Sequence, residues 1–166
     1  MKFITVEKGN PEHYALLEEM MLEYISETDA HRGISTPKEF IPKITKSMID
    51  RSDGRRILML AADENEGVGF FYAKIDKEGD AGLIRPDWGY IMEFFVRPPY
   101  RRRGIGRDMV YLCEKFFAHR GIGKVWLTAD AVTGEPFWVS CGYYDSGEVS
   151  AENGQKIFIK ELSDII

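Results

Sequence analysis

The sequence predicts an α+β fold, a three-layer α/β arrangement in which helices flank one mixed, mostly antiparallel central sheet. Segments whose apolar residues recur at helical spacing are interspersed with short apolar runs that are typical of strands. The resulting order is β-α-α-β-β-β-α-β-α-β-β, and no repeat or flexible linker divides it. A chain of 166 residues, 44% of them hydrophobic, fits one core. We therefore expect residues 1–166 to form a single domain.

The amino-terminal part is expected to form a strand and a helix. The strand covers Lys2–Glu7. Asn10 is a helix cap and Pro11 a first-turn residue, so a helix should begin there and end near Thr28. The apolar residues on its predicted inner face are Tyr14, Leu17, Met21 and Tyr24.

The next segment contains conflicting helix signals. Thr36–Glu39 has the form of a capping box, yet Pro42 interrupts a helix that starts there. We therefore expect a second helix that is short, kinked or begun late, and Gly54 ends the segment. Its apolar residues at helical spacing are Ile41, Ile44 and Met48.

The middle of the chain is predicted to form three strands. Ile57–Ala62 and Val68–Ile75 are apolar runs joined by a turn-forming segment, which is typical of an antiparallel hairpin. After a loop over Asp76–Asp87, Tyr90–Val96 is the fourth strand of the chain. The two prolines at positions 98 and 99 end it, because proline cannot donate a hydrogen bond to a sheet.

The carboxyl-terminal part is predicted to contain two helices and three strands. A helix over Gly104–His119 comes first, and Glu135–Cys141 forms a short helix that Gly142 ends. The predicted strands are Val125–Ala129, Tyr143–Glu148 and Gln155–Lys160. The predicted buried face of the longer helix consists of Ile105, Met109, Leu112 and Phe116.

Composition excludes several classes of protein. No apolar run reaches the roughly 20 residues of a membrane helix, and the first residues lack the apolar core of a signal peptide. We therefore expect a cytoplasmic protein with no membrane partner. Cys113 and Cys141 stand far apart, and the histidines are scattered. Neither a disulfide framework nor a bound metal is expected.

Positive charge is concentrated in one segment. The net charge is -5, yet five arginines lie within residues 97–107, which leaves -10 for the rest of the chain. These are Arg97, Arg101, Arg102, Arg103 and Arg107. This distribution favours a local anionic ligand such as a phosphate group over a broad nucleic-acid surface. A solvated run of charge is the alternative.

The same segment has the pattern of an anion-binding turn. The run RRRGIG, residues 101–106, follows a predicted strand and opens a predicted helix. Backbone N–H groups converge at a helix amino terminus, where the helix dipole is positive, and the two glycines let a diphosphate approach the backbone. The P-loop pattern is missing, and Met109 stands where a dinucleotide-binding fingerprint needs its third glycine.

With this signature the sequence resembles the GCN5-related N-acetyltransferase (GNAT) family, whose Q/R-x-x-G-x-G/A motif is matched at positions 101, 104 and 106. The resemblance implies that acetyl-CoA binds with its diphosphate on the N–H groups of 101–107. It also implies that the pantetheine arm lies along 94–96, in a slot where this strand splays from Val125–Ala129. The implied cosubstrate-binding residues are Phe94, Phe95, Val96, Arg101, Arg102, Arg103, Gly104, Ile105, Gly106 and Arg107.

The function that the resemblance implies is N-acetyl transfer from acetyl-CoA to a primary amine by direct attack, an acyltransferase activity of the EC 2.3.1 type. Two other functions stay open. One is a CoA-binding regulatory module of the same fold without catalysis. The other is a nucleic-acid-binding or RNA-acylating protein that uses Arg101–Arg103, which the acidic remainder of the chain disfavours.

Glu93 is the candidate general base. It is the only carboxylate within the apolar strand Ile91–Val96, and burial raises the proton affinity of such a group. The resemblance implies a backbone N–H of Val96 or a neighbour as the oxyanion donor. A structural role of Glu93, at a sheet edge or beside an arginine, is equally open. Glu135 and Asp130 are less specific candidates.

The candidate proton donor is less clear. Members of the family often carry a tyrosine four residues before a Gly-aromatic pair, which here is Gly142 with Tyr143. Trp138 occupies that position, and an indole is no practical proton source at neutral pH. We expect Trp138 to shape the thioester end of the pocket. Tyr143 or Tyr144 could donate the proton, although an aromatic residue at a strand start is more often a core residue.

No motif identifies the acceptor amine. The resemblance places its entry between the loop containing His31–Gly33 and the strands near Ser146–Asn153. A small-molecule amine and a protein amino group are both compatible with this fold. Since many relatives are dimers, a homodimer is also compatible.

Overall fold

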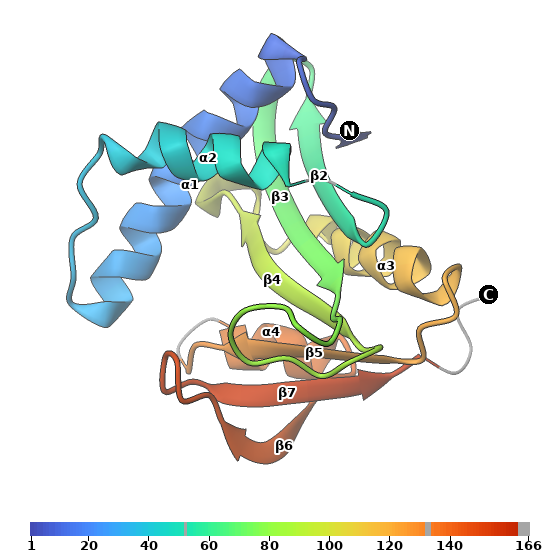
Figure 1. Ribbon diagram of the computed structural model, residues 1–166. Coiled ribbons are helices and arrows are strands. Elements are labelled where there is room, and N and C mark those ends of the chain that lie inside the picture. Colours follow the sequence, from blue (N-terminus) through green and yellow to red (C-terminus); the bar gives the residue numbers. More distant parts are fainter. Residues whose placement is uncertain (52, 132–133, 163–166) are drawn as a thin grey trace. The chain divides into compact units, whose positions relative to one another are not determined.

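The computed structural model describes residues 1–51, 53–131 and 134–162. The chain forms two compact units, each built from two stretches of sequence (Figure 1). Unit 1 comprises Met1–Tyr72 and Glu93–Met109, and unit 2 comprises Ala73–Met92 and Val110–Ile166. The expectation that residues 1–166 act as a single domain stays a prediction.

The described residues contain seven strands, which hydrogen bonds join in the order β1-β2-β3-β4-β5-β7-β6. The pair β4–β5 is parallel, whereas β1–β2, β5–β7 and β6–β7 are antiparallel. The α+β class with a mixed, mostly antiparallel sheet is therefore confirmed. The strands are β1 (Lys2–Thr5), β2 (Arg56–Asp63), β3 (Glu66–Ile75), β4 (Gly89–Val96), β5 (Lys124–Ala129), β6 (Tyr144–Val149) and β7 (Lys156–Glu161).

Helix α1 (Pro11–Arg32) starts as the sequence predicts but ends later. The side chain of Asn10 accepts hydrogen bonds from the N–H groups of Glu12 and His13, at 3.0 and 3.1 Å. The predicted end near Thr28 is wrong by about a turn. Residues 29–32 contain neither glycine nor proline, and the helix stops at Gly33, whose φ of 68° lies in the left-handed region that glycine favours.

Helix α2 (Phe40–Asp50) begins late, which was one of the predicted alternatives. Thr36 does not cap it. Its N–H and hydroxyl bind the carboxylate of Asp29 instead, at 2.6 and 3.1 Å. Pro42 therefore falls in the first turn, where a helix needs no N–H donor, and it does not interrupt the helix. Helices α1 and α2 pack side by side in unit 1, and Tyr14 donates to the carbonyl of Pro42 (Figure 1).

The core of unit 1 covers both faces of β3, since Phe70 packs against Tyr24 of α1 while Phe71, the next residue, points to the opposite face and stacks on Phe94. Large, fully buried side chains of this unit include Leu17, Met20, Leu60, Phe70 and Phe71. Gly69 of β3 permits a close approach to β4, because a Cβ at that position would lie 2.4 Å from the carbonyl oxygen of Phe95. A side chain at position 69 would therefore displace the strand that carries Glu93.

Helix α3 (Ile105–Ala118) begins in unit 1 and continues in unit 2. Ile105 and Met109 are buried as predicted, but Leu112 and Phe116 retain exposure. Cys113 and Phe117 take the buried positions, because i+4 steps continue the face that Met109 starts. Figure 1 shows β5, β7 and β6 side by side in unit 2, which also contains the short helix α4 (Gly134–Ser140).

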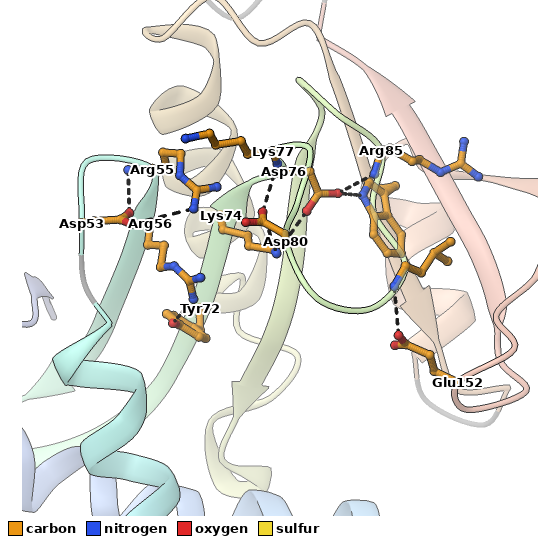
Figure 2. A network of polar contacts seen from close by, with 12 residues as sticks. Asp53, Arg55, Arg56, Tyr72, Lys74, Asp76, Lys77, Asp80, Arg85 and Glu152 are labelled. Carbon is orange, nitrogen blue, oxygen red and sulfur yellow. Dashed lines mark hydrogen bonds and ion pairs between the residues drawn. The ribbon is translucent and has the colours of Figure 1, made fainter.

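The loop between β3 and β4 contains a buried polar cluster that the sequence did not predict (Figure 2). Asp76 is fully buried and accepts from the N–H of Arg85 at 2.9 Å and from the indole of Trp126 at 2.7 Å. The Lys74 ammonium lies 3.5 Å from Asp76 and 3.1 Å from Asp80. These contacts fix the loop within unit 2. Within the described residues, no helix combines the length and the apolar character that spanning a membrane requires.

Candidate active site

The chain turns sharply between β4 and α3. A 3-10 helix over Pro98–Tyr100 follows β4, and α3 starts at Ile105. Arg102 and Gly104 both have left-handed backbones, with φ of 62° and 84°. A Cβ on Gly104 would meet no atom within 4 Å, so the positive φ alone accounts for glycine at this position.

The amino terminus of α3 presents N–H groups that no helical carbonyl can accept. Asp108 is the first residue whose N–H bonds back within this helix, to the carbonyl of Gly104 at 3.1 Å. The N–H groups of residues 105–107 therefore point out of the helix end. The N–H of Arg101 is already used, since it donates to the carbonyl of Pro98 at 3.2 Å. The backbone N–H groups best placed to bind an anion at this turn are therefore those of residues 102–107.

Three arginines around this turn, Arg102, Arg103 and Arg107, have exposed side chains. Together with the positive end of the helix dipole they make the turn suitable for a diphosphate group. The chemistry of the donors fits the predicted ligand: N–H groups and guanidinium groups both donate to phosphate oxygens, and Gly104 leaves open space at the backbone.

The other two arginines of the predicted basic segment are held by carboxylates of α1. Arg101 makes a two-pronged ion pair with Glu27, at 2.9 and 2.8 Å, and its Nε donates to the carbonyl of Val96 at 2.7 Å. Arg97 pairs with Glu23 at 2.6 Å. Their charges are thus compensated inside unit 1, and the exposed basic patch is smaller than the five arginines predicted from the sequence.

Glu93 lies on β4 and accepts a hydrogen bond at its Oε2 from the hydroxyl of Tyr24 on α1. Desolvation raises the pKa of Glu93 to about 7, and the hydrogen bond from Tyr24 opposes this shift. Although the residue as a whole retains some exposure, its carboxyl is enclosed enough for desolvation to prevail. A carboxyl with a pKa near neutrality can exchange a proton at physiological pH.

The neighbouring residues of β4 are held by ring contacts and by a hydrogen bond to the backbone. Phe95 is buried and contacts the rings of Tyr24 and Phe70, with centroid distances of 5.5 and 6.0 Å. Phe94 stacks on Phe71 at 6.5 Å. The carbonyl of Val96 is taken by Arg101, as described above. The oxyanion role of a β4 N–H group and the pantetheine contacts stay predictions.

Trp138 and Tyr143 belong to unit 2, where the Trp138 ring packs edge-on against the rings of both Phe137 and Tyr143. Trp138 is 6% exposed and Tyr143 is 2% exposed. The Tyr143 hydroxyl donates to the buried carboxylate of Glu114 at 2.9 Å. Burial first, and the charge of Glu114 next, raise the pKa of Tyr143 well above its usual value. This geometry favours a structural role for Tyr143, and its role as proton donor stays a prediction.

The less specific candidates all have structural partners. Asp130 accepts from the N–H of Gly134 at 3.1 Å, and Glu135 lies 3.6 Å from the ammonium of Lys156. Tyr144 donates to Glu161 at 2.7 Å. These contacts tie α4 and the final strands together, and they give no support to a catalytic role for Asp130 or Glu135.

Sequence reasoning missed two residues of α1. Tyr24 was expected only as part of an apolar face, and Glu27 was not singled out at all. A signal for Glu27 exists, since Glu19, Glu23 and Glu27 recur every four residues, as Arg97 and Arg101 do. No comparable local pattern marks Tyr24, because its partner lies 69 residues away in sequence.

Comparison with known proteins identifies the family to which the sequence belongs. The model of the acetyltransferase (GNAT) family matches residues 15–143, more than half of the chain. No curated protein sequence is similar enough to count as a match.

Several solved structures share the fold. The PaiA N-acetyltransferase from Thermoplasma acidophilum in complex with coenzyme A has 18% identity and a TM-score of 0.71, with 98% of this chain and 100% of that chain covered. An aminoglycoside 6'-N-acetyltransferase complexed with coenzyme A has 18% identity and a TM-score of 0.73, with coverage of 100% and 98%. Tetrahymena GCN5 has 14% identity and a TM-score of 0.68, with coverage of 98% and 97%. The chain belongs to the acetyltransferase (GNAT) family.

Proposed function

We propose that this protein is an N-acetyltransferase that moves an acetyl group from acetyl-CoA to a primary amine by direct attack. The observation that carries the proposal is Glu93, a β4 carboxyl with a pKa of about 7 in the same unit as an open, basic helix terminus. Family membership supports acyl transfer in general. Two similar structures contain coenzyme A, which supports a CoA-type donor.

The donor would be held by its diphosphate at the start of α3. The proposed donors are the N–H groups of residues 102–107, with side chains of Arg102, Arg103 and Arg107 adding charge. The pantetheine arm is proposed to run along Phe94–Val96. Arg101 contributes indirectly, because its side chain fixes the carbonyl of Val96 and so the backbone of that strand.

Glu93 is the proposed general base. The amine nitrogen attacks the thioester carbon, the carbon–sulfur bond breaks, and the thiolate leaves. The acceptor ammonium first gives one proton to the Glu93 carboxylate, directly or through one water, so that its nitrogen has a free electron pair for attack, and the second proton passes from the nitrogen to solvent after attack. The leaving thiolate takes a proton from solvent, since a thiol with a pKa of about 8.5 is already a good leaving group near neutral pH. A side-chain acid is therefore dispensable in this proposal.

The acceptor is proposed to be a cationic amine, as a small molecule or a protein amino group. One similar structure is an aminoglycoside 6'-N-acetyltransferase, which supports a small-molecule amine as one class of acceptor. Because acetyl-CoA is made and used inside cells, this function fits a cytoplasmic protein. We also propose that residues 1–166 act as one functional domain, and homodimer formation stays an expectation.

The donor site is tested by thermal melting with and without CoA. Wild type should melt at a higher temperature with CoA, because a ligand that binds only the folded state stabilises it. Gly104→Val should lose this shift. Gly121→Val is the matched control, since Gly121 also has a positive φ, 75°, and open space around a Cβ, so the backbone strain is similar. Absence of a shift in folded wild type would contradict the donor site.

The base is tested by thiol release from acetyl-CoA across a panel of amines. Glu93→Gln should lower kcat by about a hundredfold or more, the usual contribution of a general base, while the CoA melting shift persists. The kcat/KM of wild type should fall below a pH of about 7, the pKa of Glu93. If wild type binds CoA but acylates no amine, the CoA-binding module without catalysis becomes the better function.

A further inference from the structure

Glu93 is held from across unit 1 by the hydroxyl of Tyr24, which donates to Oε2. The Tyr24 ring is itself fixed, since it packs edge-on to Phe70 at 5.5 Å and against Phe95 at 5.5 Å. Glu93 and Phe95 point to the same face of β4, because side chains alternate along a strand. The ring and the carboxylate therefore belong to one packed cluster.

Two ion pairs fix the position of α1 along its own axis, and with it the level of the Tyr24 side chain. Glu23 lies beside Tyr24 in sequence and binds Arg97, while Glu27 lies nearly one turn further on and binds Arg101. Arg97 follows β4 directly, and Arg101 follows the 3-10 helix that comes next. Helix α1 thus cannot slide along its axis without breaking these pairs, and the Tyr24 hydroxyl is kept at the level of Glu93.

The hydrogen bond uses one carboxylate oxygen only. Among the described residues, no other side chain bonds to Glu93 and no basic group forms an ion pair with it. Phe70 of β3 and Phe95 of β4, which flank the Tyr24 ring, carry no titratable group. Tyr24 on α1 is therefore the titratable group that faces Glu93, and Oε1 is left to accept a proton.

We propose that Tyr24 is a positioning residue, which holds the Glu93 carboxylate by Oε2 so that Oε1 faces the attacking amine. This inference rests on the proposed function. The hydroxyl also favours the charged form of Glu93, since a hydrogen-bond donor stabilises a carboxylate more strongly than a neutral carboxyl group. Tyr24 would thus keep part of the base in its active, ionised form at neutral pH, against the desolvation that favours the proton.

The test follows Glu93 directly, by NMR of the protein with ¹³C-labelled glutamate carboxyls. Glu93→Gln identifies the Glu93 signal by removing it, and this signal should titrate near a pH of about 7 in wild type. In Tyr24→Phe the midpoint should rise by about one unit, a tenfold change in proton affinity, because the donor is gone. The ring remains, so packing against Phe70 and Phe95 should keep the protein folded.

The matched control is Tyr14→Phe. Tyr14 lies on the same helix, and its hydroxyl also makes an interhelical hydrogen bond, to the carbonyl of Pro42 at 3.2 Å. Its removal should leave the Glu93 midpoint unchanged. A second variant works in the opposite direction: 3-fluorotyrosine at position 24 is a stronger donor and should lower the midpoint. This variant also covers the case in which Tyr24→Phe folds poorly.

Activity then separates this inference from the proposed function. With an acceptor found in the thiol-release assay, Tyr24→Phe should lower kcat about tenfold at neutral pH and move the acid limb of kcat/KM upward, with KM for acetyl-CoA unchanged. A Glu93 midpoint that stays constant or falls in Tyr24→Phe overturns the positioning role, even if Glu93→Gln abolishes turnover. Full turnover in Glu93→Gln instead overturns the base assignment, whatever the NMR shows.

Discussion

Two tyrosine–glutamate pairs, one in each unit, have the same kind of hydrogen bond but different neighbouring charges. In unit 1 the hydroxyl of Tyr24 donates to Glu93, and in unit 2 the hydroxyl of Tyr143 donates to Glu114. Both carboxylates are removed from bulk water. The difference between the pairs therefore shows what turns a buried carboxylate into a structural group or a reactive one.

Glu114 is paired with a cation, whereas Glu93 has none among the described residues. The ammonium of Lys160 lies 3.0 Å from one oxygen of Glu114 and 3.1 Å from the other, and it also donates to the carbonyl of Cys141 at 2.9 Å. In the part of the chain that the structure describes, no basic side chain pairs with Glu93, and its pKa rises to about 7. A compensated carboxylate holds elements together, whereas an uncompensated one can take up a proton.

One of the two largest expected effects comes from breaking the compensated pair. Lys160→Met should destabilise the protein by about 3 kcal/mol, because Glu114, with a side chain only 5% exposed, would keep a buried charge without its cation. Urea unfolding at neutral pH measures this loss. The double variant Lys160→Met with Glu114→Gln should recover much of it, since the charge is removed as well. Equal losses in the single and double variants would show that lost packing, not charge, is responsible.

The uncompensated pair should respond in the opposite sense. The pKa of Glu93 rises from 4.5 to about 7 on folding, so the folded state binds the proton more tightly and loses stability as pH rises through this window. Above a pH of about 7 the cost is about 3 kcal/mol. Glu93→Gln cannot ionise, so its stability relative to wild type should increase by about that amount between pH values of about 4.5 and 8.

Urea unfolding across this pH range measures that difference, and Glu64→Gln, at an exposed turn position, is the control for the Glu-to-Gln change itself. If the stability difference between Glu93→Gln and wild type does not change with pH, Glu93 ionises in the folded protein as easily as in the unfolded chain. The contrast between the two pairs would then disappear.

The smallest effect is expected at Tyr143. Tyr143→Phe should cost about 2 kcal/mol, because a buried carboxylate loses one donor but keeps Lys160. The pH-rate profile should keep its shape, since this hydroxyl is committed to Glu114. If wild type loses rate at alkaline pH and Tyr143→Phe removes that loss without a loss of stability, Tyr143 is instead the proton donor.

Local signals in the sequence determined most of the fold. The cap at Asn10, the strand runs, and the basic glycine turn at residues 101–106 depend on residues a few positions apart, and the structure has these elements where they were predicted. The family signature belongs to the same class, because a turn and a helix start can be recognised from adjacent residues. Errors arose where a nearby alternative competed, as when Asp29 took the hydroxyl of Thr36 that would have capped a helix.

Only the tertiary structure decided which ionisable groups are available for chemistry. The sequence shows five arginines in one segment, but the charge of Arg101 is compensated by Glu27, which lies 74 residues away in sequence. Tyr24, which donates to Glu93, lies 69 residues away from it in sequence. Whether a carboxylate meets a lysine, as Glu114 does, or a lone hydroxyl, as Glu93 does, depends on which side chains packing brings together. The charge of a buried group is set by those neighbours and by the water they exclude, and neither is encoded in the residues next to it in the chain.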